Sequence, residues 1–238
     1  MVRANNIIGR FNAPGGVRVE IDSSLLWLVG LIVYFSLGSG LVGGLIFVAV
    51  LVGSILLHEL GHAWGSIVQG VPVKRVVLYG GGGFCERRAT PTYRSQELIV
   101  AMGPIVNIAI WALGGIAIWG LFWGMAQAGP GGYAYLGGVS SLMGFLSLLA
   151  GVNLALFLFN MVPVQPLDGG KLLHLALLRY MPADQAMRVT GAVGYVLSIL
   201  WIPGMIVFFL TYGWVLFFMP SIKDHKAMMQ GRAMAPAD

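Results

Sequence analysis

Two histidines and a glutamate lie in the segment ILLHELGH, at positions 58, 62 and 59 of an otherwise apolar run. On a helix, His58 and His62 leave the same face one turn apart, so both imidazoles can bind one metal ion. Glu59 would lie beside that ion and could accept a proton from water. Zinc fits best, because two imidazoles and a carboxylate leave a fourth position for water, whose pKa falls to about 7. Asp168 is the candidate for the third ligand.

The surroundings of these residues favour a functional interpretation over a chance match. Seven of the nine Asp and Glu residues fall in loops, tails or the first turns of apolar runs, where water can reach them; Glu59 and Asp168 do not. An ionisable side chain in lipid costs several kcal/mol unless a partner compensates it. Two histidines and a glutamate close together in an apolar run therefore indicate a functional site.

The elements that must position these residues are membrane helices. Of the 238 residues, 58% are hydrophobic and only 10% are charged, whereas a soluble domain has about 25% charged residues. We predict an all-α polytopic membrane protein with about six transmembrane helices, interrupted by a small strand or hairpin element at the membrane edge. The predicted spans are residues 24–38, 42–69, 96–125, 138–160, 186–201 and 203–220. The last two could also form one kinked helix, although their combined length favours two.

We expect one domain over residues 1–238, with a polar, partly strand-like segment at 1–22, a membrane core at 23–220 and a basic tail at 221–238. The loop at 70–95 and the tail are too short for an additional domain. The single cysteine, Cys85, excludes a disulfide within the chain and is interpreted as a packed or loop thiol.

The basic residues indicate the orientation. If the N-terminus is cytoplasmic, thirteen of the fourteen Lys and Arg residues fall in cytoplasmic segments, as the positive-inside rule requires. The net charge of +5 therefore follows from topology and does not indicate nucleic-acid binding. We expect both termini in the cytoplasm and a prokaryotic plasma (inner) membrane as the location.

Three motifs together carry a family resemblance. HELGH at 58–62, GPIVN at 103–107 and NMVPVQPLDGG at 160–170 resemble the site-2 protease family of intramembrane zinc metalloproteases, in a compact form without PDZ or CBS domains. The resemblance covers about residues 20–182. It implies that His58, His62 and Asp168 bind one Zn²⁺ and that Glu59 is the general base. It also implies that Asn160 positions the substrate backbone or stabilises the oxyanion.

For several other polar residues, the sequence leaves more than one role open. Asn160 could cap the broken helix instead, and Asn107 could serve helix packing. His174 could support Asp168 or simply lie at the interface. His225 lies in the basic tail and is expected to be solvated.

The expected substrate is a transmembrane segment of another protein in the lipid bilayer, cleaved within or near the membrane. Such a helix must unwind before hydrolysis, and the strand-like VKRVVLY, residues 73–79, could offer an edge for the unwound segment. Selectivity would come from the membrane core, the short loops or a regulatory membrane protein. The alternatives are a zinc or divalent metal transporter and an inactive binding scaffold. Both are disfavoured, because no second ladder of polar side chains follows the spans and every expected ligand and the base are present.

Overall fold

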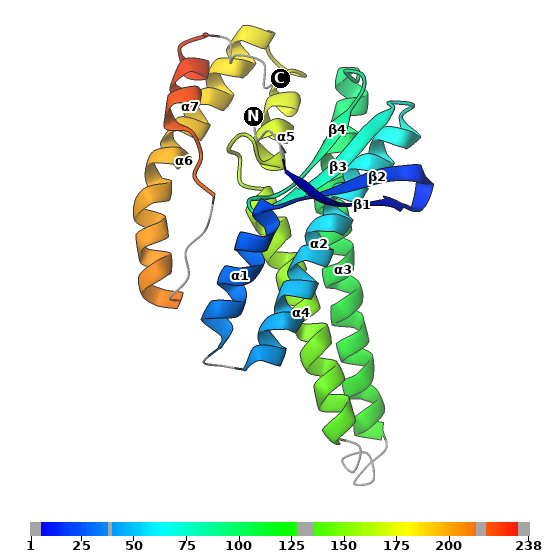
Figure 1. Cartoon of the computed structure of the whole chain (residues 1–238). Helices are drawn as coiled ribbons and strands as arrows, with labels where there is room; N and C mark the ends of the chain where they lie inside the picture. Colours follow the sequence, from blue (N-terminus) through cyan, green and yellow to red (C-terminus); the bar gives the residue numbers. More distant parts are fainter. Residues whose placement is uncertain (1–5, 38–39, 128–135, 213–217, 233–238) are drawn as a thin grey trace.

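Helices make up most of the structure, a computed structural model that describes residues 6–37, 40–127, 136–212 and 218–232. In Figure 1, α2, α3 and α4 run side by side as a long bundle, with a small sheet at one end and α6 and α7 to one side. The helices are α1 (Ser24–Ser36), α2 (Leu41–Val68), α3 (Tyr93–Gln127), α4 (Leu136–Asn160), α5 (Asp168–Leu177), α6 (Ala183–Tyr212) and α7 (Ile222–Met229). The strands are β1 (Ile7–Ala13), β2 (Val17–Asp22), β3 (Val73–Tyr79) and β4 (Gly82–Arg87).

Four helices in the described part of the chain are long and apolar enough to cross a membrane, namely α2, α3, α4 and α6. The predicted count of six spans is not confirmed. Helix α1 is apolar but has only 13 residues, or about 20 Å at about 1.5 Å per residue, against a hydrocarbon thickness of about 30 Å. The two spans predicted on either side of Pro203 form one helix, α6, as far as Tyr212. A proline inside a helix removes one backbone hydrogen bond and can kink the helix without ending it.

The strand element is a four-stranded sheet in the order β1-β2-β3-β4. The hairpin of β1 and β2 is antiparallel, β2 pairs with β3 in parallel, and β3 pairs with β4 antiparallel. The N-terminal hairpin thus covers β3, which is an inner strand. The prediction that VKRVVLY provides a sheet edge is therefore wrong, and β4 is the edge strand on that side.

The sheet packs on α2 through a small apolar core. Val19 of β2, Val76 of β3 and Ala63 of α2 are each 0% exposed, and Leu56 and Leu60 pack against them. Because Leu56 and Ala63 flank the HELGH segment and Leu60 lies within it, this core holds the motif next to β3 and β4. Cys85 of β4 also contacts the core, and burial raises the pKa of its thiol to about 12. The thiol is therefore protonated at neutral pH, as expected for a packed cysteine.

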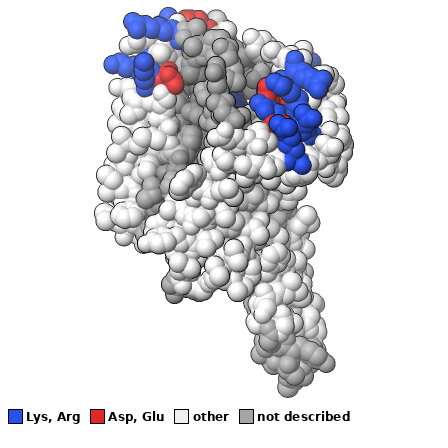
Figure 2. Space-filling view, viewed as in Figure 1, with Lys and Arg blue, Asp and Glu red and all other residues white. Residues whose placement is uncertain are grey.

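The charged side chains gather at the end of the molecule that carries the sheet. Figure 2 shows Lys and Arg over the sheet and around α6 and α7, whereas the visible surface of the helical bundle is free of them. Within the sheet, Arg75 bridges Glu20 and Glu86 at 2.6 Å from each, and hydrogen bonds from Lys74 and Arg75 lower the pKa of the Glu86 carboxyl. The paired charges thus remain ionised at the edge of the apolar bundle.

Helix α7 corrects a second prediction. His225 was expected to be solvated, yet its side chain is 1% exposed and packs against α6. The sequence could not show this, because the short polar helix buries its histidine only through a tertiary contact.

Candidate metal centre

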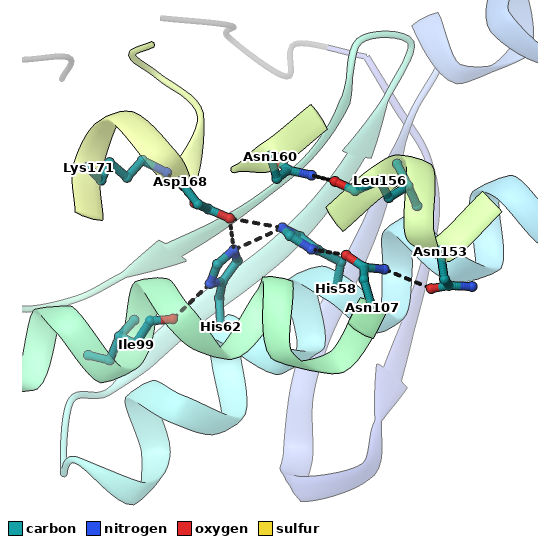
Figure 3. A network of polar contacts seen from close by, with 9 residues as sticks. All are labelled: His58, His62, Ile99, Asn107, Asn153, Leu156, Asn160, Asp168 and Lys171. Carbon is teal, nitrogen blue, oxygen red and sulfur yellow. Dashed lines mark hydrogen bonds and ion pairs between the residues drawn. The ribbon is translucent and has the colours of Figure 1, made fainter. Parts of the chain in front are cut away.

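Two helices bring three potential ligands to one point (Figure 3). His58 and His62 lie one turn apart on α2, and Asp168 is the first residue of α5. One ligand atom from each lies within 4.8 Å of the others. The exposed fractions are only 4%, 9% and 3%. The three residues that the sequence nominated as ligands are thus adjacent, although Asp168 is more than a hundred positions further along the chain.

The separation of the donor atoms fits a tetrahedral ion. The Nε2 atoms of His58 and His62 are 3.1 Å apart, and each lies 3.1 Å from Oδ2 of Asp168. Ligands about 2.05 Å from a tetrahedral zinc ion lie about 3.3 Å from one another. The triangle therefore needs only a small expansion to accept one zinc ion.

Hydrogen bonds on the far side of each imidazole show that these donor atoms carry lone pairs. Nδ1 of His62 lies 2.8 Å from the carbonyl oxygen of Ile99, and Nδ1 of His58 lies 2.5 Å from Oδ1 of Asn107. Both contacts require a proton on Nδ1, which leaves Nε2 unprotonated in a neutral imidazole. Two ring lone pairs and a carboxylate oxygen therefore face one another, and a cation is the partner that satisfies all three.

The orientation of Asn107 is set by a buried chain of amides. Asn153 of α4 donates to the backbone carbonyl of Leu149 and to Ser54 Oγ, both at 2.9 Å, so its Oδ1 must accept the 2.8 Å hydrogen bond from Asn107 Nδ2. Asn107 Oδ1 then faces His58. Asn107 and Asn153 are each 0% exposed. Sequence reasoning missed Asn153, although a lone asparagine in an apolar run was the available signal.

Glycine in the GPIVN segment makes room for the imidazoles. A Cβ atom on Gly103 of α3 would lie 2.5 Å from Nε2 of His62 and 2.7 Å from Nε2 of His58. Any larger residue at this position would therefore overlap the ligands. Gly103 and Asn107 are one turn apart on α3, so one residue admits the histidines and the other orients His58. This assigns Asn107 to the metal centre, beyond helix packing.

Asp168 is placed by a tightly folded loop. A Cβ atom on Gly169 would lie 2.2 Å from the carbonyl oxygen of Met161, and one on Gly170 would lie 2.5 Å from the carbonyl carbon of Val164. The glycine pair after Asp168 therefore lets the first turn of α5 pack on the loop.

The Asp168 carboxylate also has a cationic neighbour. Nζ of Lys171 lies 3.0 Å from Oδ1 of Asp168, the oxygen that does not face the histidines. Burial would raise the pKa of the Asp168 carboxyl, but its pKa lies well below the usual range, and the nearby Lys171 ammonium is the largest cause that lowers it. The carboxylate is thus ionised, as a ligand must be.

Glu59 lies beside the ligands but points toward the sheet. Its side chain is buried, with 7% of the residue exposed, and a Cβ atom on Gly83 of β4 would lie 2.6 Å from Glu59 Cγ. The absence of a side chain at Gly83 therefore leaves space for the glutamate between α2 and β4. A carboxylate has the chemistry of a general base, and Glu59 directly follows His58 on α2.

The remaining candidates are less closely tied to the cluster. Asn160 lies next to the ligands in Figure 3, but its side chain donates to the carbonyl of Leu156 at 3.0 Å on its own helix. This is the helix-end role considered from the sequence. A carboxamide nitrogen has two hydrogens, so this bond does not preclude a second one. His174 lies 3.4 Å from Oγ1 of Thr190 on α6. Burial lowers the pKa of His174, and its contact with α6 fits a packing role.

Removing the amide of Asn107 should weaken the metal centre. In Asn107→Ala, His58 loses the acceptor that keeps its proton on Nδ1, so we expect the affinity for zinc to fall by about 10- to 100-fold, as for other outer partners of metal ligands. Competition with a chromogenic chelator measures this. Asn107→Asp keeps an acceptor oxygen and should retain more affinity than Asn107→Ala. Equal affinity in the wild type and in Asn107→Ala would contradict the assignment.

Known proteins are similar to this chain in both sequence and fold. Residues 124–201 match the profile of Peptidase family M50. A putative zinc metalloprotease of Synechocystis is 29% identical over 182 residues, covering 71% of this chain and 43% of that protein. The putative zinc metalloprotease Rip3 of Mycobacterium tuberculosis is 33% identical over 153 residues, covering 62% of this chain and 33% of that protein. This chain therefore matches less than half the length of these relatives.

A solved structure extends the similarity over most of the chain. The Site-2 Protease from Methanocaldococcus jannaschii superposes with a TM-score of 0.59 at 21% identity, over 94% of this chain and 92% of that one. At this identity the superposition establishes the fold. The four helices that are long and apolar enough to cross a membrane indicate an integral membrane protein. The resemblance drawn from the three motifs is thus confirmed: residues 124–201 match Peptidase family M50, and the chain has the fold of a site-2 protease.

Proposed function

We propose that the protein is an intramembrane zinc metalloprotease that hydrolyses peptide bonds within or near transmembrane segments of other proteins. The observation that carries this proposal is the buried triangle of two imidazole lone pairs and one carboxylate oxygen, 3.1 Å apart, next to a buried glutamate on an apolar helix. The relatives are named zinc metalloproteases, which agrees with the proposal. The histidines lie on a helix that is long and apolar enough to cross a membrane, which supports a reaction at the bilayer.

Each residue has a defined part in this proposal. His58, His62 and Asp168 hold one zinc ion, with Nε2, Nε2 and Oδ2 as the donor atoms. Zinc supplies a Lewis acid that activates water and polarises a carbonyl group. The Glu59 carboxylate accepts the proton of the attacking water and returns it to the leaving amine nitrogen. Asn160 uses its second N–H to hold the substrate backbone or the developing oxyanion.

The edge of the sheet is the proposed entry for the substrate. A transmembrane helix must unwind before its peptide groups can be hydrolysed, and an extended segment can add to a free strand edge through backbone hydrogen bonds. Because β3 is internal, this edge is β4, whose Gly83 touches Glu59. A segment paired with β4 would therefore run close to the base.

Proline in β4 tests this docking. Consecutive strand residues direct their N–H groups to opposite sides, so one of Phe84 and Cys85 donates outward. Proline at the outward residue removes one donor and is tolerated on an edge. We expect that variant to keep its metal and to cleave several-fold more slowly. Proline at the other residue breaks pairing with β3 and serves as the comparison. If the variant with proline at the outward residue cleaved as fast as the wild type, docking of the substrate on β4 would be contradicted.

The remaining expectations become part of the proposal. Residues 1–238 form one protease domain, with both termini on the cytoplasmic side of a prokaryotic plasma membrane. The gathering of Lys and Arg at the end with the sheet and α7 supports this orientation. The metal centre, at the same end of the bundle, would then open toward the cytoplasm.

Metal removal and restoration test the activity. The purified protein in liposomes is incubated with a single-span model substrate whose helix is broken by central glycines and labelled at one end. We expect cleavage to stop after treatment with 1,10-phenanthroline and to return with stoichiometric zinc. The same liposomes report zinc uptake through an internal dye. Uptake without cleavage of any model substrate would refute the protease and support the transporter.

A further inference from the structure

Helix α7 is packed closely on the first half of α6. A Cβ atom on Gly194 would lie 2.0 Å from Cδ2 of His225, and one on Gly191 would lie 2.6 Å from Cβ of Met228. His225 and Met228 are 1% and 3% exposed. The two glycines thus form a flat surface on α6 that accepts these two side chains of α7.

The imidazole of His225 makes a hydrogen bond on each side of its ring. Nδ1 lies 2.7 Å from the carbonyl oxygen of Ser221, at the start of α7. A carbonyl only accepts, so Nδ1 carries the proton and Nε2 carries a lone pair. That lone pair accepts the backbone N–H of Gln165 at 3.1 Å. His225 therefore joins α7 to the loop between α4 and α5.

This loop carries the metal ligand. Gln165 is three residues before Asp168, and the loop's own hydrogen bonds are short-range, from Val164 N–H to Val162 and from Leu167 N–H to Val164. His225 holds the same loop from a distant part of the chain. Because Gly170 packs directly on the carbonyl group of Val164, a shift at Gln165 would be transmitted to the first turn of α5 and its carboxylate.

We propose that His225 is a positioning residue for the metal centre: it holds the loop at Gln165 and thereby fixes the Asp168 carboxylate opposite the two histidines. Helix α7 is then a brace of the metal site, although it lies outside the residues 124–201 that match the family profile. This inference rests on the proposed function only in taking Asp168 as a metal ligand. It does not depend on which substrate, if any, is cleaved.

The test measures cobalt binding, because Co²⁺ accepts the same ligands and its visible spectrum reports their geometry. The full-length protein in detergent is titrated as the wild type and as His225→Leu, His225→Gln and Met228→Ala. Leucine fills the space without an acceptor, whereas the glutamine carboxamide reaches about as far as Nε2. Met228→Ala alters the packing of α7 but leaves the bond to Gln165. Hydrogen exchange of the Gln165 amide is measured in parallel for all four proteins, and the wild-type rate is informative by itself.

We expect His225→Leu to weaken Co²⁺ binding by about 10- to 100-fold and to change the spectrum. His225→Gln should restore most of the affinity, and Met228→Ala should match the wild type. Equal affinity and spectra in His225→Leu and the wild type would overturn the proposal, as would an equal loss of affinity in Met228→Ala.

If His225→Leu does not fold, the exchange rate of the Gln165 amide in the wild type decides. Slow exchange supports the contact with His225, and exchange at the rate of an unstructured amide overturns the proposal. A protein that binds cobalt in this pattern but cleaves nothing would refute the protease proposal alone.

Discussion

Glu59→Gln is expected to retain stoichiometric zinc while hydrolysing a transmembrane substrate about 100- to 10,000-fold more slowly than the wild type, the range attributed to general acid–base catalysis. Glutamine has nearly the same shape as glutamate, so it keeps the packing against Gly83 of β4. It cannot accept a proton, and the three ligands are unchanged. Metal content by atomic emission and single-turnover cleavage of the labelled substrate measure the two effects separately.

The control for this substitution is Glu97→Gln. Glu97 pairs with Arg179, which lies just after α5, and is not among the residues of the metal centre, so its replacement should change cleavage little. Two results would contradict the role of Glu59. Undiminished cleavage by Glu59→Gln would place the base elsewhere, and simultaneous loss of zinc would make Glu59 a structural residue.

Asp168→Ala is expected to lose both the metal and the activity. The substitution removes one of the three donor atoms and leaves the two imidazole lone pairs without the carboxylate oxygen that faces them. Loss of an outer partner costs about 10- to 100-fold in metal affinity, so loss of a direct ligand should cost more than about 100-fold. Zinc competition titration and cleavage at saturating zinc measure the outcome.

Asp184→Ala is the matched control, because Asp184 is an exposed aspartate at the start of α6 that pairs with Arg188. It should bind zinc and cleave as the wild type does. If Asp168→Ala bound zinc with unchanged affinity, the third ligand would have to be another group. The assignment of the loop, and with it the role of His225, would then fall.

The helix pattern explains why the sequence alone identified most of the site. His58 and His62 are separated by one helical turn, so their adjacency is a local property of α2. Asp168 stood out because it is an acid beside a broken apolar run. Asn107 and Asn153 were harder to identify, since the meaning of a buried amide depends on its partner, and that partner lies on another helix.

The sequence by itself determined what depends on neighbours along the chain. The long apolar helices α2, α3 and α4, a strand-forming region, the charge asymmetry and the three nominated ligands all follow from hydropathy, spacing and residue type. These features could be predicted because each residue's local neighbours carry the information.

Only the tertiary structure decided which surfaces meet. It placed β3 inside the sheet, because the N-terminal hairpin pairs with it across two intervening helices. It showed α6 continuing through Pro203 and buried His225 of a polar helix against Gly194 and the loop before Asp168. The physical reason is the same in each case: strand pairing, helix packing and the partner of a buried polar atom depend on groups that are distant in sequence, and local periodicity does not encode which of them come together.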